Sequence, residues 1–197
     1  MIRLLVAAQL LLAGTLAAAA CGNGLLLSLL FRAYPEAKAV VSADREARRD
    51  GRLTGPAWST KDTASLHEWR AQKTAATIRR LRQNAADLGA PIPENQGAHL
   101  FLIHEFRWIE LKREAGGLSL VSREHGPDGD EVRIFTTRRV LDNLLDGNID
   151  WRNAVDSNFI ASRGSQREIA AWLAVLRELT GEEKGKTANL QPNQARP

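Results

Sequence analysis

Two histidines and a glutamate stand close together in the middle of the chain, and their side chains are common ligands and bases. His99, His104 and Glu105 form the pattern H-x-x-x-x-H-E. In the zinc-binding helix of metalloproteases the histidines stand at i and i+4 with the glutamate between them, so that both imidazoles reach one ion. Here the histidines are one position further apart and the glutamate lies outside the pair. A metal-dependent hydrolase using these three residues is therefore our alternative function, and we predict no metal site and no cofactor.

Other polar groupings also lack the spacing that a reaction requires. Asp128, Asp130 and Glu131 alternate like calcium ligands, but the glycine and the closing glutamate of a calcium loop are not in place, so we predict a turn. The segment around Gly164 is predicted to cap a helix rather than to bind an anion. No G-x-S-x-G elbow and no phosphate-binding glycine loop occurs. We therefore predict no catalytic residue.

The N-terminal segment has the parts of an export signal. Arg3 is followed by an apolar run, Leu4 to Leu16, and then by small residues and Cys21. A cysteine at this point resembles a bacterial lipobox, in which the thiol is lipidated, although Ala18 stands where a larger aliphatic residue is usual. Three interpretations stay open: a lipoprotein acylated on Cys21, a cleaved soluble periplasmic protein, and an uncleaved anchor that reaches Phe31. We predict an exported bacterial protein, periplasmic or membrane-anchored.

Length and composition allow one domain with a core of its own. The chain has 197 residues, a single cysteine and a formal net charge of +4. This mild positive charge permits contact with an anionic surface but does not indicate nucleic acid, which we exclude as a partner. We divide the chain into a signal peptide at 1–20, a helical segment and loop at 21–58, an α+β domain at 59–181 and a disordered tail at 182–197.

A long basic helix is predicted to open the α+β domain. Ser59 or Thr60 can cap it, apolar residues recur at helical spacing as far as Leu88, and Gly89 ends it. Its basic character comes from Arg70, Lys73, Arg79, Arg80 and Arg82. They form either a solvated face or a contact surface for phospholipid headgroups or an acidic partner.

The middle of the domain is predicted to form the sheet. Residues 98–114 fit a buried helix or an extended segment, and alternation after Phe106 favours strands. The runs Leu118 to Arg123 and Val132 to Thr136 flank a cluster of turn residues, so we expect them to pair as antiparallel neighbours.

Helices are predicted to close the domain. The first begins at Thr136 or Thr137 and ends at Gly147, a short turn surrounds Trp151, and the last helix runs from Ser165 to Gly181. The expected fold class is α+β: a small antiparallel sheet packed against helices, preceded by the long basic helix and by an N-terminal export or anchor helix.

The order of these elements resembles that of sterol-carrier-like domains, which include lipid-carrier modules and the domain fused to alkyl sulfatases. The residues that carry the resemblance are Val132, Ile134, Thr136, Val140, Leu141, Leu144, Leu145, Gly147, Trp151, Ala154, Ile160, Gly164, Ile169 and Leu173. The resemblance covers roughly Phe106 to Leu179. It implies a curved sheet with helices on one side and a tunnel for an apolar chain. The lining residues that it implies are Ile109, Leu120, Ile134, Leu141, Leu145, Phe159 and Trp172.

We therefore predict a non-enzymatic binding or accessory module, exported and tethered to a membrane through its N-terminus. Its expected partner is a lipid or other apolar ligand, or a partner protein. Besides the hydrolase, a structural subunit of a membrane complex, anchored by Leu4 to Phe31, stays open.

Overall fold

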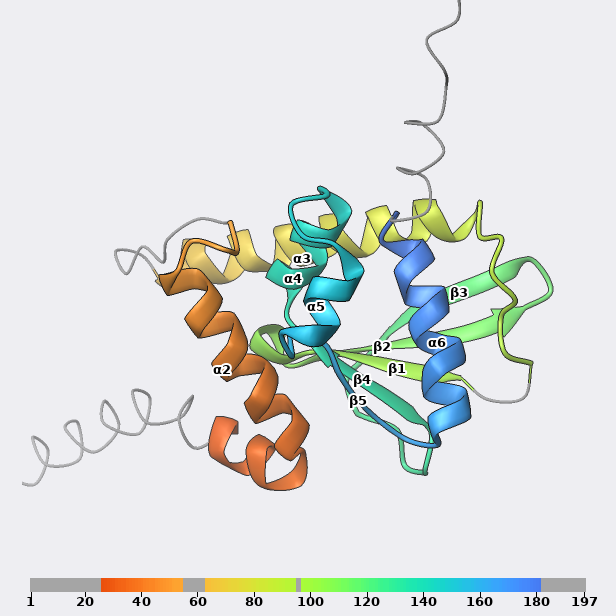
Figure 1. The fold of residues 1–197 in the computed structure, drawn as a ribbon, viewed down its shortest axis with the longest axis horizontal. Coiled ribbons are helices and arrows are strands. Elements are labelled where there is room, and N and C mark those ends of the chain that lie inside the picture. Colours follow the sequence, from red (N-terminus) through yellow and green to blue (C-terminus); the bar gives the residue numbers. More distant parts are fainter. Residues whose placement is uncertain (1–25, 55–62, 95–96, 182–197) are drawn as a thin grey trace, which may run out of the picture.

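The computed structural model of this chain describes residues 26–54, 63–94 and 97–181. The predicted signal peptide, Cys21, the helix cap at Ser59 or Thr60 and the tail at 182–197 lie outside these ranges. The described residues form helices packed on a five-stranded sheet, so the fold class is α+β, as predicted (Figure 1). Among the described helices, none combines the length and the apolar character that crossing a bilayer requires.

The order of elements is α2 (Pro35–Arg49), α3 (Thr63–Ala85), β1 (Ala98–Leu102), the 3₁₀ turn η1 (Ile103–Glu105), β2 (Arg107–Glu114), β3 (Gly117–Arg123), β4 (Val132–Thr136), α4 (Arg138–Leu145), α5 (Trp151–Asp156), β5 (Ala161–Arg163) and α6 (Gln166–Leu179). Residues 26–33 form a further helix that stops before Tyr34. Pro35 begins α2, because a fixed φ and a missing N–H are both accommodated at the first helical position.

The sheet is mixed, in the order β3-β2-β1-β4-β5, and the predicted purely antiparallel sheet is wrong because β4 runs parallel to β1. Residues 98–114 form two antiparallel strands joined by η1, which confirms strands from Phe106 onward and excludes a buried helix. The expected pairing of Leu118–Arg123 with Val132–Thr136 is wrong. β3 pairs only with β2, whereas β4 runs parallel to β1, with Ala98 opposite Val132. The turn cluster between β3 and β4 is a longer connection, and it packs on the Trp108 ring, which a Cβ at Gly126 would approach to 2.9 Å.

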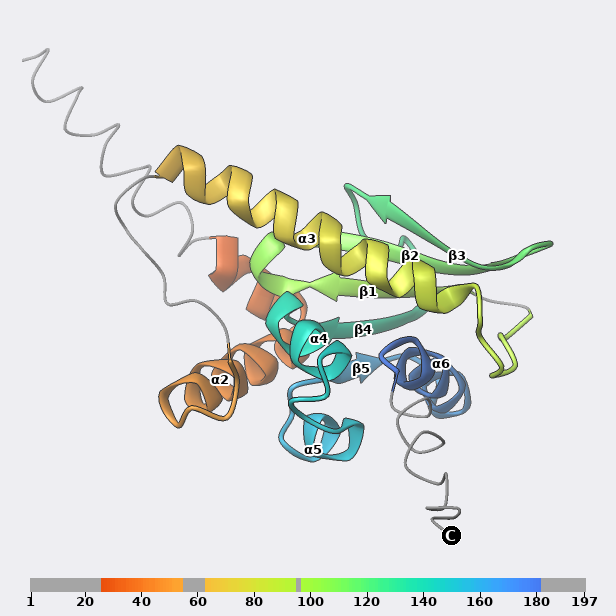
Figure 2. The ribbon, with the colours of Figure 1, turned by 90° about the horizontal axis from the view of Figure 1, so that it is seen from above.

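Side chains alternate between the two faces of the sheet, and each face has its own core. Leu100, Ile109 and Ile134 lie on the face covered by α3, α4, α5 and α6. Phe101, Trp108 and Phe135 lie on the opposite face, against α2 and residues 27–34. The implied arrangement with helices on one side only is therefore wrong, because the N-terminal helices cover part of the second face. Figures 1 and 2 show α2 at one end of the molecule and α6 at the other.

The predicted boundaries of the closing helices are confirmed. The Thr137 hydroxyl accepts the N–H of Val140 at the start of α4, and Gly147 follows α4 with a φ of 70°, the left-handed conformation that glycine adopts most readily. The Ser165 hydroxyl caps α6. Between α5 and α6 the chain forms the short edge strand β5, at Ala161–Arg163.

One carboxylate fixes the chain after α3 to the closing helix. Glu178 of α6 accepts the backbone N–H groups of Gly89, at 2.5 Å, and Ala90, at 2.6 Å. Two charge-assisted hydrogen bonds to backbone donors hold this turn more firmly than neutral contacts would. They help to set the position of α3, which forms one wall of the groove described below.

Candidate functional site

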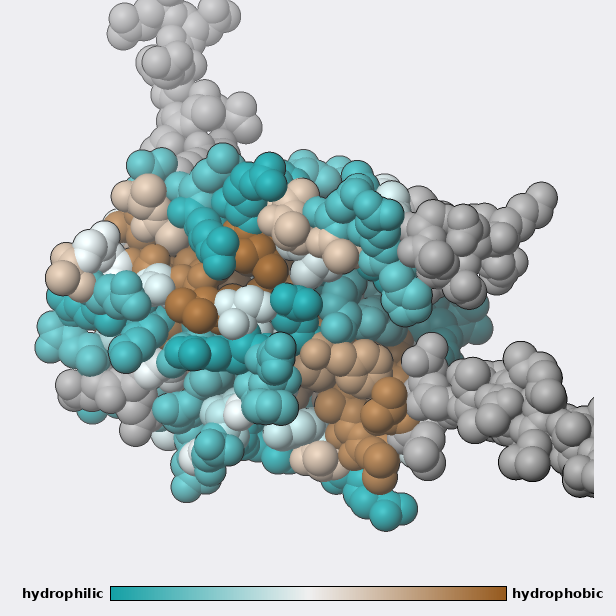
Figure 3. Space-filling model, turned by 180° about the vertical axis from the view of Figure 1, so that it is seen from behind, coloured by the Kyte–Doolittle hydropathy of each residue, from teal (hydrophilic) through white to brown (hydrophobic). Residues whose placement is uncertain are grey.

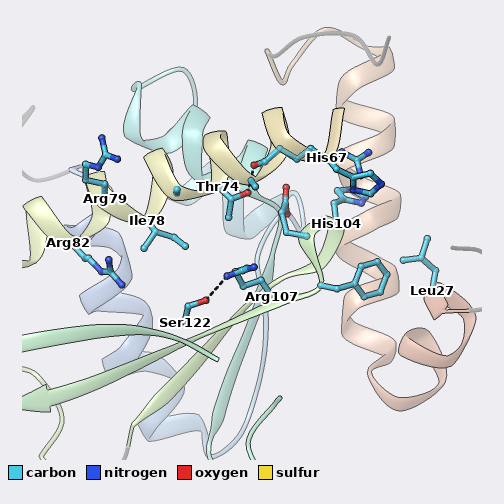
Figure 4. A pocket seen from close by; sticks show the side chains of 14 residues that line it. Leu27, His67, Thr74, Ile78, Arg79, Arg82, His104, Arg107 and Ser122 are labelled. Atoms are coloured by element: carbon cyan, nitrogen blue, oxygen red, sulfur yellow. Dashed lines mark hydrogen bonds between the residues drawn. The ribbon is translucent and has the colours of Figure 1, made fainter. Parts of the chain in front are cut away.

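A groove of about 800 Å³ lies between α3 and the start of β2 (Figure 4). Its residues on α3 are spaced three or four apart and so share one face of the helix: His67, Arg70, Ala71, Thr74, Ala75, Ile78, Arg79 and Arg82. Ala71 and Ala75 are exposed, and their small side chains leave room that larger residues would fill. The opposite wall consists of residues from η1 to the start of β2, Ser122 of β3 and Leu27.

Four arginines make the groove basic. Arg82 donates to the Leu120 carbonyl through Nε, at 3.2 Å, and Nη2, at 2.9 Å, and Arg107 donates to the Ser122 hydroxyl at 3.0 Å. These two guanidinium groups are therefore oriented by the strands. Arg79 is exposed along the helix, and burial lowers the pKa of Arg70 although the nearby Glu105 opposes that shift. Against four arginines the groove has one carboxyl group, so it favours an anion.

Glu105 is that carboxyl group, and its surroundings keep it from ionising readily. Burial raises the pKa of Glu105 above its ordinary value, although Arg138 and His104 act in the opposite direction. One oxygen lies 3.4 Å from Nε of Arg138, and the other is buried without a hydrogen-bond partner. Arg138 also pairs with Asp142, which accepts the Thr77 hydroxyl at 2.6 Å. The groove is thus backed by a polar network that joins η1, α3 and α4.

A second buried carboxylate holds the N-terminal helices against this network. Asp44 of α2 is 2% exposed and accepts the Thr137 hydroxyl at 3.1 Å. It also lies 3.6 Å from Nε2 of His104 and 3.9 Å from Nε of Arg139. Burial alone would raise the pKa of Asp44, but His104, Arg139 and Thr137 outweigh it, so the pKa is lowered. Asp44 is therefore a charged anchor between α2, η1 and α4.

The three residues of the alternative hydrolase do not converge. His104 and Glu105 are neighbours beside the groove, but His99 lies on the second face of the sheet near Trp108, with its Nε2 2.5 Å from Glu131. No set of three His, Cys, Asp or Glu side chains in the described ranges is placed to hold a metal ion.

The predicted lining residues come together, but in the core. Ile109, Leu120, Ile134, Leu141, Phe159 and Trp172 are buried in one cluster, and Leu145 packs against it. None of these seven side chains lines the groove. A ligand among them would have to displace core packing, and that site stays a prediction.

The sequence did carry a signal for the groove. Arg70, Arg79 and Arg82 belong to the predicted basic helix, for which contact with phospholipid headgroups or an acidic partner is one interpretation. The exposed alanines between them share their spacing, but the sequence alone does not show which residues face a second wall. Phe106 and Arg107 belong to that wall, and no pattern in the sequence indicates this role for them.

No protein-family model and no curated protein matches the sequence. Solved structures similar to the chain include the sec-alkylsulfatase Pisa1 from Pseudomonas sp., at 16% identity and a TM-score of 0.33, over 41% of this chain and 12% of that one. The ubiquinone synthesis protein UbiJ-SCP2 is similar at 13% identity and a TM-score of 0.39, over 55% of this chain and 97% of that one. Sterol carrier protein 2 from Yarrowia lipolytica is similar at 15% identity and a TM-score of 0.31, over 57% of this chain and 80% of that one. The chain thus spans about an eighth of the alkylsulfatase, and the function proposed below rests on its own residues.

Proposed function

We propose that this protein is a non-enzymatic binding module for an amphiphile with an acidic headgroup, such as a fatty acid or an anionic phospholipid. The observation that carries the proposal is the composition of the groove: four arginines lie along it, and Leu27, Ile78 and Phe106 supply apolar surface. An apolar groove alone would suit any oily chain, whereas this combination favours a ligand with an anionic end.

The two parts of such a ligand have separate sources of affinity. A guanidinium donates paired hydrogen bonds to a carboxylate or phosphate, and such charge-assisted bonds are among the stronger ones. The apolar part gains roughly 25 cal/mol for each Å² removed from water. The groove volume of about 800 Å³ lies within the range of small-molecule sites, about 300–1,000 Å³.

The N-terminal sequence supports a location at a membrane for this activity. The apolar leader and Cys21 fit an exported protein tethered by a lipid or by an uncleaved anchor. A membrane is the place where acidic amphiphiles are abundant. Mass spectrometry of the mature N-terminus distinguishes cleavage, acylation and an intact leader.

A steric substitution tests the groove as the site. We expect Ala75→Phe to fill the groove and to weaken binding of cis-parinaric acid at least tenfold, measured by the fluorescence that this fatty acid gains on leaving water. Ala76→Phe is the matched control, because Ala76 is exposed on the same helix but does not line the groove. Equal affinity in both variants would place the ligand elsewhere.

A charge substitution tests the acidic headgroup. Arg79→Gln removes an exposed guanidinium from the groove, and Lys73→Gln removes the same charge from a position of the same helix that does not line it. Because Arg79 is solvent-exposed, we expect a loss of roughly 1 kcal/mol, about fivefold in affinity. Lys73→Gln should leave the affinity unchanged, and an equal loss in both variants would show only a nonspecific charge effect.

A further inference from the structure

Large apolar side chains are exposed at one end of the molecule. Within the described ranges, four such residues are strongly exposed, and three of them are Leu26 at 51%, Leu29 at 52% and Phe106 at 40%. Leu26 and Leu29 lie one turn apart on the helix at 26–33, and Leu27 of that helix lines the same groove as Phe106. Figure 3 shows the apolar surface of this end at its lower right. The fourth residue, Val155, is on α5.

The helix at 26–33 carries large apolar side chains on its outer face as well as on its inner face. Leu27, Leu30 and Phe31 pack against the aromatic core on the second face of the sheet, whereas Leu26 and Leu29 point outward. A helix on the surface of a water-soluble protein normally keeps its outer face polar. An apolar patch of this kind marks a surface that another apolar body covers.

The charges around the patch fit a negatively charged body. Arg32 is exposed one turn after Leu29, beside the patch, whereas the Arg107 guanidinium lies in the groove, bonded to Ser122. The first acidic residue in the sequence is Glu36, so the 35 residues before it contain two arginines and no carboxylate. The sequence that leads into the patch is itself long and apolar. Apolar side chains rimmed by arginine are typical of proteins that lie on anionic membranes.

We propose that Leu26, Leu29 and Phe106 dock on the surface of an anionic phospholipid bilayer, with Arg32 at the level of the headgroups. The docking surface includes one end of the groove, since Leu27 and Phe106 belong to both. Figure 4 shows Leu27 at the end of the groove away from Arg79 and Arg82. An amphiphile would therefore enter from the bilayer at the apolar end, and this last step rests on the proposed function.

Site-specific fluorescence tests the docking surface in the full-length chain. Cys21→Ser removes the single cysteine, and a cysteine is then introduced in place of Leu29, Phe106 or Val155 and labelled with the dye NBD. Each protein is mixed with vesicles of phosphatidylcholine and phosphatidylglycerol in equal amounts, with part of the lipid carrying bromine on its acyl chains. We expect the dyes at 29 and 106 to lose at least half of their emission through contact with bromine, and the dye at 155 to change little.

Quenching of the dye at position 106 distinguishes docking of the folded domain from anchoring by the leader. If the leader alone holds the protein, the dye at 29 is quenched while the dye at 106 behaves like the dye at 155, which overturns the proposal. Equal quenching at all three positions overturns it as well. If the emission changes with protein concentration in the absence of vesicles, the patch binds a second copy of the chain, and the proposal is overturned.

Two further measurements test the role of bilayer charge and the binding of ligand separately. Vesicles of phosphatidylcholine alone should quench the dyes at 29 and 106 at least threefold less, and equal quenching would overturn the anionic part of the proposal. Binding of cis-parinaric acid is measured without vesicles. Its loss in Ala75→Phe therefore reports on the groove alone, so a failure of the proposed function and a failure of membrane docking give different results.

Discussion

Replacing Asp44 with asparagine should destabilise the protein at neutral pH and hardly at all in strong acid. The carboxylate is 2% exposed and is surrounded by His104, Arg139 and the Thr137 hydroxyl. Removing one partner of a fully buried ion pair costs about 3–5 kcal/mol. The ion-pair distances here are 3.6 Å and 3.9 Å and the His104 side chain is 32% exposed, so solvent screens part of that cost.

The replacement also retains some of the bonding. Asparagine still accepts the Thr137 hydroxyl, but the negative charge that His104 and Arg139 face is lost. A hydrogen bond to a charged group contributes about 1.5–3 kcal/mol. We therefore expect Asp44→Asn to lower the free energy of unfolding by about 2 kcal/mol. Asp44→Ala also leaves the buried hydroxyl without its acceptor, and we expect it to cost about 3 kcal/mol.

The dependence on pH follows from the direction of the pKa shift. Because the folded protein lowers the pKa of Asp44, the ionised carboxylate contributes stability above its unfolded pKa, and that stability is lost as pH falls through the lower, folded pKa. The difference between the native protein and Asp44→Asn should therefore shrink as pH falls below the ordinary value of 3.8. Urea unfolding followed by tryptophan fluorescence at several pH values measures it. A difference that stays constant in acid would refute an ionised Asp44 as the anchor.

Three further predictions concern single side chains. Because burial raises the pKa of Glu105, its negative charge in the groove is lost at a higher pH than usual. We expect the affinity for cis-parinaric acid to rise as pH falls toward the point where the fatty acid itself protonates. Glu105→Gln should reduce that rise, although His67 and His104 also line the groove, and it should tighten binding at neutral pH. Glu178→Ala removes two charge-assisted bonds to the turn after α3 and should cost about 2 kcal/mol in urea unfolding, with Glu178→Gln retaining part of it. Gly164→Ala should cost about 1–3 kcal/mol by the same assay, because φ is 141° and a Cβ would stand 3.2 Å from the Val132 Cα; a variant as stable as the native protein would refute that constraint.

Local signals predicted the elements well. The hydroxyl of Thr137, the glycine at 147 and the hydroxyl of Ser165 act on the backbone within one turn of their own position, so their effect can be recognised in a short window of sequence. The strand at Val132–Thr136 and the closing helix followed from apolar periodicity, which also depends only on neighbours.

Pairing between distant strands could not be predicted in this way. β1 and β4 are parallel neighbours although two strands separate them in the chain, and no property of Ala98 or Val132 alone specifies the other. The turn residues between β3 and β4 favour a hairpin locally. The long connection instead lies on Trp108, a contact that exists only once the second face of the sheet is formed.

The walls of the groove could not be predicted for the same reason, and the apolar tunnel that the resemblance implies stays a prediction. The sequence pattern of a basic helix face is the same whether that face is exposed to solvent or lines a groove. Apolar side chains such as Ile109, Ile134 and Trp172 could line a tunnel or fill a core, and in the structure they are buried in the core. One face of α3 becomes the side of a groove because η1, the start of β2, Ser122 and Leu27 lie opposite it.

The N-terminal helices connect the two proposals physically. Leu27 contributes to the groove, the neighbouring Leu26 and Leu29 are exposed, and the Asp44 carboxylate of α2 lies beside His104, next to Glu105 in the chain. The proposed docking surface at Leu26 and Leu29 is thus connected through the helix at 26–33 and through α2 to the segment that carries Glu105, the carboxyl group that opposes an acidic ligand. Asp44→Asn should therefore weaken cis-parinaric acid binding as well as stability, because it loosens η1. Unchanged binding in a destabilised variant would show that the wall at η1 is held by β1 and β2 alone.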